Sequence, residues 1–453
     1  MSLRFGTDGI RGVAGRELTP ELVLALGRVA GRILGVAGRP FLVGRDTRWS
    51  GPLLQAAFSA GVAAEGCDVV DLGVLPTPGV AMTAADRRAP AAVISASHNP
   101  FADNGIKLLA AGGRKLADDE ETTLESALSD DLTARRSPPT GEGTGLGRLS
   151  GDPDAAGRYC RRLVDALEGR TLGGLRVVVD CGNGASVTTA APVLRAAGAE
   201  VVEVLSDTPD GTNINAGCGS TDTRALACAV VADGAAAGLA FDGDADRVIA
   251  VDDRGRPVDG DRLIALFASD LHQRGRLAGG AVAVTVMTNL GFHQAMARAG
   301  IQVASTQVGD RYVLEALEAN RWSLGGEQSG HIIFRDLATT GDGVLTGLLL
   351  LDLLSRREET LSALADAAMT RMPQVLRNVA VADPAGLDAA APVWAQVRSV
   401  ESELGGDGRV LLRRSGTEKL VRVMVEAPSE ETAQHAVRRL TEAVLDALGS
   451  PTA

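Results

Sequence analysis

Three aspartates at alternate positions are the most distinctive chemical feature of the sequence. They lie in DGDADR (residues 242–247), directly after an apolar run that predicts a buried strand. Alternate side chains of an extended segment point to one side, so three carboxylates there would repel one another unless a cation held them. Oxygen ligands of this kind suit magnesium, which commonly shares its coordination with a substrate phosphate. The alternative is an acidic turn without a metal, because Asp and Gly are common in turns.

A serine in SASHNP (residues 95–100) follows another apolar run. Ligands of open α/β folds bind at the carboxyl ends of the strands, which makes Ser97 a candidate nucleophile. Its hydroxyl would need a base or a metal before it could attack phosphorus. On this segment alone, a Ser/Asn/Pro turn without chemistry is the stronger interpretation.

Two further segments are suited to an anionic sugar. RRSGT (residues 413–417) combines guanidinium, hydroxyl and backbone N–H donors, with Arg422 on the next predicted strand. Such donors bind phosphate, and arginine does so through its planar fork. GGEQSGH (residues 325–331) pairs glycines with polar groups that suit sugar hydroxyls, although an ordinary turn explains it equally well. Neither segment matches the Walker A loop or the dinucleotide-binding fingerprint, so ATP and NAD have no support.

Strand-like and helical patterns alternate around these segments. Apolar runs predict buried strands at residues 40–44, 67–72, 91–95, 175–180, 200–205, 238–241, 281–287 and 301–305. Helices are predicted at residues 53–65 and 290–299. This βαβ rhythm indicates largely parallel sheets. A polar stretch rich in Gly, Pro, Ser and Thr predicts a linker at residues 137–154.

Length and pattern together indicate four domains. The chain has 453 residues, which exceeds the ~250–300 residues at which single hydrophobic cores stop growing. We predict α/β domains at residues 1–150, 151–256 and 257–372. After Pro373 the pattern changes, and an α+β domain is predicted at residues 373–453.

Composition restricts the class of partner and the location. The formal net charge of −12 argues against nucleic acid or an anionic membrane as a partner. The five cysteines have no metal-type spacing, there is no N-terminal signal pattern, and no apolar run reaches the ~18 residues of a membrane span. We therefore expect a cytoplasmic protein, either a monomer or a homodimer.

Taken together, the motifs resemble those of the α-D-phosphohexomutase family, in that family's order and over nearly the whole chain. They are FGTDGIRG (5–12), SASHNP (95–100), DNGIK (103–107), DGDADR (242–247), VGDRYV (308–313), GEQSGH (326–331) and RRSGTEK (413–419). The resemblance implies an isomerase with four domains around a central cleft, three similar mixed α/β domains plus a C-terminal α+β domain. The forms of FGTDGIRG, VGDRYV and GEQSGH are most similar to those of members that act on glucosamine phosphates, on the route to UDP-N-acetylglucosamine and the bacterial cell wall.

The resemblance also implies roles for individual residues. It implies a phosphoserine at Ser97, with magnesium held by that phosphate and by Asp242, Asp244 and Asp246. The implied substrate-binding residues are Arg247, Gly309, Asp310, Glu327, Ser329, Arg413, Ser415, Gly416, Thr417 and Arg422. The implied catalytic cations and proton-transfer candidates are Arg11, Lys107 and His331. One departure from the family is Lys419, which stands where a proline is usual.

In the implied reaction, the phosphoserine donates its phosphoryl group to a sugar phosphate. This gives a 1,6-bisphosphate, which turns end over end before Ser97 takes back the other phosphoryl group. Glucose or glucosamine 1,6-bisphosphate is the expected activator and intermediate. Lys107 is a candidate base if its pKa is lowered by burial among cations, although simple pairing with phosphate fits it equally well. We expect the C-terminal domain to close over the cleft, as catalytic lids do.

Three other functions compete with this interpretation. The nearest is a family member that acts on mannose or glucose phosphates. The second is a metal-dependent phosphomonoesterase, since a serine beside a metal can also hydrolyse phosphates, although hydrolysis needs no second phosphate site. The third, a catalytically inactive sugar-phosphate sensor, fits poorly because the serine, the aspartates and the candidate bases are all present.

Overall fold

The computed structural model describes residues 9–133, 143–414 and 419–449. The chain forms two compact units, each described by itself. The first unit comprises Met1–Met287 and Ile301–Ala368, and the second comprises Thr288–Gly300 and Met369–Ala453. Residues 288–300 thus belong to the same unit as the C-terminal part of the chain.

The first sheet is mixed and has seven strands in the order β1-β5-β4-β2-β3-β7, with β6 paired to β5. The strands are β1 (Ile10–Val13), β2 (Phe41–Arg45), β3 (Val69–Val74), β4 (Ala91–Ile94), β5 (Asp103–Ala110), β6 (Arg114–Lys115) and β7 (Leu149–Gly151). The helices are α1 (Pro20–Leu34), α2 (Gly51–Ala64), α3 (Thr77–Arg87) and α4 (Asp118–Thr133). A Cβ atom on Gly61 would lie 2.2 Å from the carbonyl oxygen of Leu24, so glycine lets α1 and α2 pack closely.

The prediction of a linker at residues 137–154 is wrong for part of that stretch. Residues 149–151 form β7, which pairs in parallel with β3 and extends the first sheet. This strand is short and exposed, so it carries no apolar periodicity that sequence reasoning could detect. Residues 134–142 lie outside the described part of the chain.

The second sheet has the order β12-β11-β10-β8-β9. Its strands are β8 (Arg176–Asp180), β9 (Glu200–Leu205), β10 (Ala237–Phe241), β11 (Val248–Asp252) and β12 (Pro257–Val258). Around it lie α5 (Ala155–Asp165), α6 (Ala190–Ala196) and α7 (Arg224–Asp233). The strand predicted at 200–205 coincides with β9.

The third sheet has the order β14-β13-β15-β16. Its strands are β13 (Ala281–Thr285), β14 (Gln302–Thr306), β15 (Leu324–Gly326) and β16 (Ile332–Phe334). The helices of this part of the first unit are α8 (Gly260–Gln273), α10 (Asp310–Asn320), α11 (Gly343–Ser355) and α12 (Leu361–Ala368). Within the described ranges, no helix combines the length and apolar character needed to cross a bilayer.

The three sheets share one arrangement of four strands. The orders are β5-β4-β2-β3, β11-β10-β8-β9 and β16-β15-β13-β14. In each order, the first pair is an antiparallel hairpin and the other two pairs are parallel. The three hairpin turns carry SASHNP, DGDADR and GEQSGH. Equivalent turns in three similar sheets therefore present the three site motifs, although the sequence has no visible residue-level repeat.

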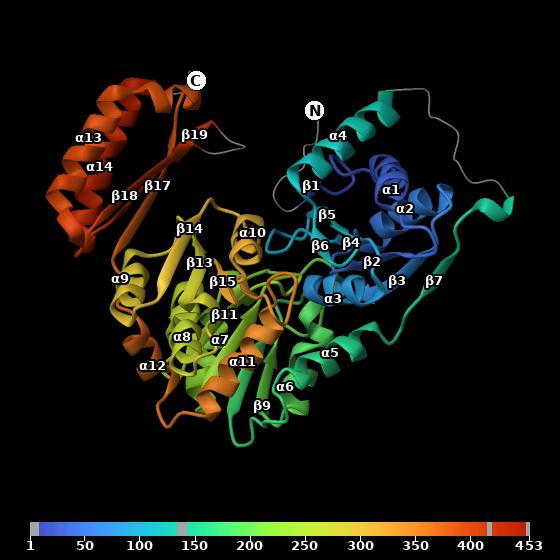
Figure 1. The fold of residues 1–453 in the computed structure, drawn as a ribbon, viewed down its shortest axis with the longest axis horizontal. Coiled ribbons are helices and arrows are strands. Elements are labelled where there is room, and N and C mark those ends of the chain that lie inside the picture. The colour runs from blue at the N-terminus through green and yellow to red at the C-terminus, as the bar shows by residue number, and fades with distance from the viewer. Residues whose placement is uncertain (1–8, 134–142, 415–418, 450–453) are drawn as a thin grey trace. The chain divides into compact units, whose positions relative to one another are not determined.

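The second unit is α+β, as predicted. Its antiparallel sheet has the order β17-β19-β18, formed by β17 (Gln374–Ala380), β18 (Arg409–Arg414) and β19 (Leu420–Glu426). The helices α13 (Ala391–Leu404) and α14 (Glu430–Leu448) cover one face of this sheet (Figure 1). The helix α9 (Leu290–Ala299) also belongs to this unit. Valines of the strands and α14 residues such as Leu440 form its core.

Candidate active site

The three aspartates of DGDADR converge in the turn between β10 and β11. One carboxylate oxygen from each of Asp242, Asp244 and Asp246 lies within 4.8 Å of the others, and all three residues are buried. The segment is a turn rather than an extended strand, and Ala245 adopts a positive φ of 56°. The prediction that the three carboxylates gather because alternate side chains of an extended strand point to one side is therefore wrong, although the carboxylates do lie together. The segment is both an acidic turn and a cluster of carboxylates.

The cluster has the chemistry of a cation site. Asp244 Oδ1 and Asp246 Oδ1 are buried and accept no hydrogen bond from the described residues, although buried oxygens are usually satisfied. Burial, with Asp246 and Asp244 adding to it, raises the pKa of Asp242 well above its ordinary value. Burial acts to raise the pKa of Asp246 too, but Lys107 and His331 hold it well below its usual range. These residues fit a hard divalent ion such as magnesium.

Ser97 lies directly beside this cluster. Its Oγ donates a hydrogen bond to Asp242 Oδ2 at 2.5 Å, and its side chain is buried. Ser97 adopts a φ of 53° in the turn between β4 and β5. A non-glycine residue in this conformation persists only where its surroundings hold it, and such residues concentrate at functional sites. Two motifs that are 145 positions apart in sequence thus meet at one point.

The candidate cations of the first unit surround the serine and the aspartates. Lys107 Nζ, on β5, donates to Asp244 Oδ2 at 2.7 Å and to Asp246 Oδ2 at 3.2 Å. Arg247 Nη1 lies 3.0 Å from His98 Nδ1. Arg11 on β1 pairs with Gly105 of β5, which places it next to the same strand as Lys107. Although the chain is acidic overall, several of its cationic side chains therefore lie close to this turn.

His98, a neighbour of Ser97, is a residue that sequence reasoning missed. Its Nδ1 lies 3.3 Å from Ser97 Oγ. Burial, with help from the charges of Arg247 and Arg11, lowers the pKa of His98 to about 4. The ring is therefore neutral near neutral pH.

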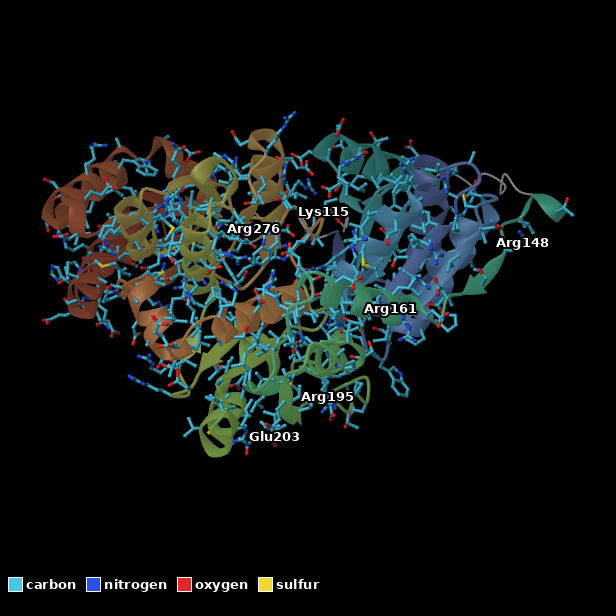
Figure 2. The ribbon with its side chains drawn as sticks, turned by 60° about the horizontal axis from the view of Figure 1, so that its bottom comes forward. Lys115, Arg148, Arg161, Arg195, Glu203 and Arg276 are labelled. Atoms are coloured by element: carbon cyan, nitrogen blue, oxygen red, sulfur yellow. The ribbon has the colours of Figure 1, made fainter. Side chains whose placement is uncertain are left out.

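His331 links the aspartate cluster to the start of α10. Its Nδ1 lies 3.7 Å from Asp246 Oδ1, and its Nε2 lies 3.2 Å from Asp310 Oδ2. Burial acts to lower the pKa of His331, but Asp310 and Asp246 outweigh it and raise that pKa. Lys115 of β6, which is labelled in Figure 2, also forms an ion pair with Asp310. A row of charged and titratable groups thus runs from Lys107 through Asp246, His331 and Asp310 to Lys115.

The predicted sugar loop is the tight turn between β15 and β16. Glu327 Oε1 accepts a hydrogen bond from the backbone N–H of Gly309 at 3.2 Å, so these two predicted residues are brought together. Ser329 is exposed at the tip of the turn. A Cβ atom on Gly330 would lie 2.1 Å from the carbonyl oxygen of Val248, which follows the aspartate turn. Glycine at position 330 therefore lets the predicted sugar loop pack against the aspartate turn.

Arg413 and Arg422 form a cationic pair in the second unit. They lie directly opposite each other on β18 and β19. Burial, and then the charge of Arg422, lowers the pKa of Arg413. Like charges placed opposite each other across a sheet are destabilising, so an anion between them would relieve the repulsion.

Ser415, Gly416 and Thr417 lie outside the described residues. Lys419 is exposed, and its carbonyl oxygen accepts a hydrogen bond from the backbone N–H of Val381 at 3.2 Å.

We expect Arg422→Ala to raise the KM for the sugar phosphate that the family resemblance implies as substrate by about 10–100-fold, because charge-assisted hydrogen bonds to phosphate contribute that much affinity. Steady-state kinetics would measure this. Arg377→Ala is a matched control, since Arg377 is exposed on β17 and pairs with Val423, one register position away. Equal KM values for Arg422→Ala and the parent protein would show that Arg422 does not contribute to substrate binding.

Family models match the chain in four consecutive parts. They are the phosphoglucomutase/phosphomannomutase α/β/α domains I, II and III, at residues 2–135, 158–255 and 259–372, and the C-terminal domain at residues 376–443. The chain belongs to the phosphoglucomutase/phosphomannomutase family. This confirms the family resemblance and the four-domain architecture predicted from the motifs.

Individual relatives in the family match over almost their whole length. The phosphoglucosamine mutase of Desulforudis audaxviator is 50% identical over 452 residues, covering 98% of each chain. That of Thermobifida fusca is 50% identical over 454 residues, covering 99% of each chain. These family members are named for one activity, and the chain is equally similar to both.

Solved structures of the family have the same fold. A phosphoglucomutase/phosphomannomutase family protein from Burkholderia thailandensis superposes with a TM-score of 0.82 at 27% identity, covering 98% of this chain and 97% of that one. The Aspergillus fumigatus N-acetylphosphoglucosamine mutase, solved with GlcNAc-6P and magnesium, has a TM-score of 0.70 at 19% identity and covers 99% and 95% of the chains. The second likeness shows the fold alone.

Sequence reasoning also missed three residues that contact the turn carrying Ser97. Asp46 and Arg48 follow β2, and Asn215 lies between β9 and α7. The available signal was GRDTR (residues 44–48), a charged run at the end of a predicted strand. Because β2 pairs in parallel with β4, this run lies at the same sheet edge as SASHNP.

Proposed function

We propose that this protein is a phosphoglucosamine mutase, an isomerase that interconverts glucosamine 6-phosphate and glucosamine 1-phosphate. Relatives with that name are 50% identical over nearly the full chain, which supports the substrate. The contact that supports the chemistry is the 2.5 Å hydrogen bond from Ser97 Oγ to Asp242 within the buried aspartate cluster. This contact supports Ser97 as the nucleophile, because an ion held by the aspartates would then lie close to a phosphate on its hydroxyl.

Ser97 would carry the phosphoryl group between the two positions of the sugar. The bond from phosphorus to Ser97 Oγ breaks as the free sugar hydroxyl bonds to phosphorus, and Oγ keeps the electron pair of the broken bond. The product is a 1,6-bisphosphate, and the reverse transfer from its other end returns a phosphoryl group to Ser97. A magnesium ion held by Asp242, Asp244 and Asp246 would neutralise charge on the phosphoryl oxygens.

The attacking hydroxyl must lose a proton to a base. Lys107 and His331 stay the two candidates, and Arg11 stays a candidate catalytic cation. The hydrogen bonds from Lys107 to two carboxylates favour its charged form, which supports pairing with phosphate rather than proton abstraction. His331 is 1% exposed behind Asp246, which supports a role in holding that aspartate.

Substrate-binding residues are proposed in each of the two units. Arg247, Gly309, Asp310, Glu327 and Ser329 are the proposed contacts in the first unit. Arg413 and Arg422 are proposed to hold the phosphate that does not react, with Ser415, Gly416 and Thr417. Their cross-strand placement supports this, because two opposed guanidinium groups suit a dianion.

Other predictions belong to the same proposal. We place the domain boundaries after residues 150, 256 and 372, and we expect glucose or glucosamine 1,6-bisphosphate to activate the enzyme. Closure of the C-terminal domain over a central cleft, a cytoplasmic location, a monomer or homodimer, and the absence of nucleic-acid or membrane partners also stay predictions.

A comparison of glucosamine, glucose and mannose phosphates tests the proposed function. We expect kcat/KM to be highest for the glucosamine phosphates, by about tenfold or more, because a site that bonds a polar substituent rejects analogues lacking it. A clear preference for mannose 1-phosphate would overturn the substrate. Steady release of inorganic phosphate without isomer formation would instead identify a phosphomonoesterase.

A further inference from the structure

The guanidinium group of Arg48 is buried beneath the turn that carries Ser97. Arg48 is 1% exposed, and its Nη2 donates to the carbonyl oxygens of Ser97 and Asn99, each at 2.8 Å. Its Nη1 donates to the carbonyl oxygen of Asp103 at 3.0 Å and also to that of Pro100. A single side chain thus binds four carbonyl groups of one turn.

Asp46 holds both the guanidinium and the other side of the turn. Its Oδ2 accepts from Arg48 Nε at 2.8 Å and from Ser95 Oγ at 2.6 Å. Ser95 Oγ in turn accepts from the backbone N–H of Ser97 at 2.9 Å. The amide and the carbonyl group of Ser97 are therefore both tied to the Asp46–Arg48 ion pair.

A second side chain reaches the same carbonyl group from the neighbouring sheet of the first unit. Asn215 Nδ2 donates to the carbonyl oxygens of Ser97 at 2.9 Å and of Asn99 at 3.2 Å. The aspartate turn approaches closely here, because a Cβ atom on Gly243 would lie 2.5 Å from Ser97 O and 3.1 Å from Asn215 Nδ2. The carbonyl group of Ser97 is thus held where the two motif turns meet.

We infer that Arg48 and Asn215 are positioning residues. They hold Ser97 in its left-handed backbone conformation, with its hydroxyl within hydrogen-bonding distance of Asp242. This inference rests on the proposed function. Neither side chain touches the hydroxyl that reacts; both act through the backbone of the serine. A misplacement of about 1 Å at a reacting group reduces turnover about 10²-fold, so loss of these bonds should lower kcat rather than substrate binding.

Arg48→Lys is the decisive variant, because an ammonium group is a point charge and cannot bridge several carbonyl groups as the planar fork does. We expect kcat for glucosamine 6-phosphate to fall about 10²-fold, while KM changes by less than about threefold, which is the pattern of a lost transition-state interaction. Single-turnover transfer from phosphorylated Ser97 to the sugar should slow by the same factor as kcat.

Arg28→Lys is a matched control. Arg28 is also buried in the first unit, where its Nε donates to Glu65 Oε1 at 2.8 Å, but it lies on α1 away from Ser97. We expect both variants to lower the melting temperature, whereas only Arg48→Lys lowers kcat per folded molecule. Equal kcat losses in the two variants would mean that Arg48 has a general structural role, and the inference would be wrong.

Asn215→Ala provides an independent measurement if Arg48→Lys does not fold. Asn215 is half-buried, and its removal should lower kcat about tenfold, as expected for one lost hydrogen-bonding group. An unchanged kcat in Asn215→Ala would overturn the inference. The parent protein separates this result from failure of the proposed function: if it does not isomerise glucosamine phosphates, the function is wrong, and if parent and variants are equally active, only the positioning role is wrong.

Discussion

Replacement of Ser97 by alanine is expected to abolish isomerisation, lowering kcat by about 10⁴-fold or more, because loss of a covalent nucleophile removes the route itself. The buried hydroxyl lies 2.5 Å from Asp242 Oδ2, so the change removes the reactive atom and leaves the turn in place. Intact mass measured after incubation with glucose 1,6-bisphosphate gives a second readout. We expect the parent protein to gain one phosphoryl group and Ser97→Ala to gain none.

Ser59→Ala is the matched control for this experiment. Ser59 is a buried serine on α2, outside the motifs that carry the site residues. Its replacement should leave both turnover and phosphoryl gain unchanged. If Ser97→Ala still isomerised glucosamine phosphates, or still gained a phosphoryl group, the covalent relay through Ser97 would be disproved.

Asp244→Asn is the second change with a large expected effect. It keeps the shape of the side chain but removes one of three clustered carboxylate charges. It also weakens the ion pair with Lys107 Nζ, now 2.7 Å from Asp244 Oδ2. We expect kcat to fall about 10³-fold, the size seen when a group that stabilises transition-state charge is lost. The parent protein should also lose activity in a chelator and regain it with magnesium.

Calorimetric titration with magnesium separates loss of the ion from loss of folding. The parent protein should bind the ion and Asp244→Asn should bind it more weakly, because charge and ligand number set affinity for hard cations. Asp270→Asn is a matched control, since Asp270 is a buried carboxylate on α8 that pairs with Arg356 at 3.0 Å. Equal magnesium affinity in the parent protein and Asp244→Asn would exclude the aspartate cluster as the metal site.

Local patterns in the sequence predicted much of the fold. Continuous apolar runs marked β2, β4, β8 and β10, because strands buried on both faces need apolar side chains at successive positions. The structure places β9 at Glu200–Leu205, the predicted limits. The short exposed strand β7 was missed, since its three residues bury little and show no pattern. That the three sheets repeat one strand order was implied only by the family resemblance and not by any repeat of residues, because topology needs no repeated residues.

By itself, the sequence determined which chemical groups the chain carries, which segments carry them, and the family to which those segments belong. Only the tertiary structure decided which groups meet. Ser97 reaches Asp242, Lys107 reaches Asp244, and His331 reaches Asp246 through contacts between residues far apart in the chain. The physical reason is that apolar periodicity is a local property, whereas these side chains converge because equivalent hairpin turns of separate sheets pack against one another. Arg48 lies in the charged run GRDTR, but only the structure revealed its four carbonyl contacts.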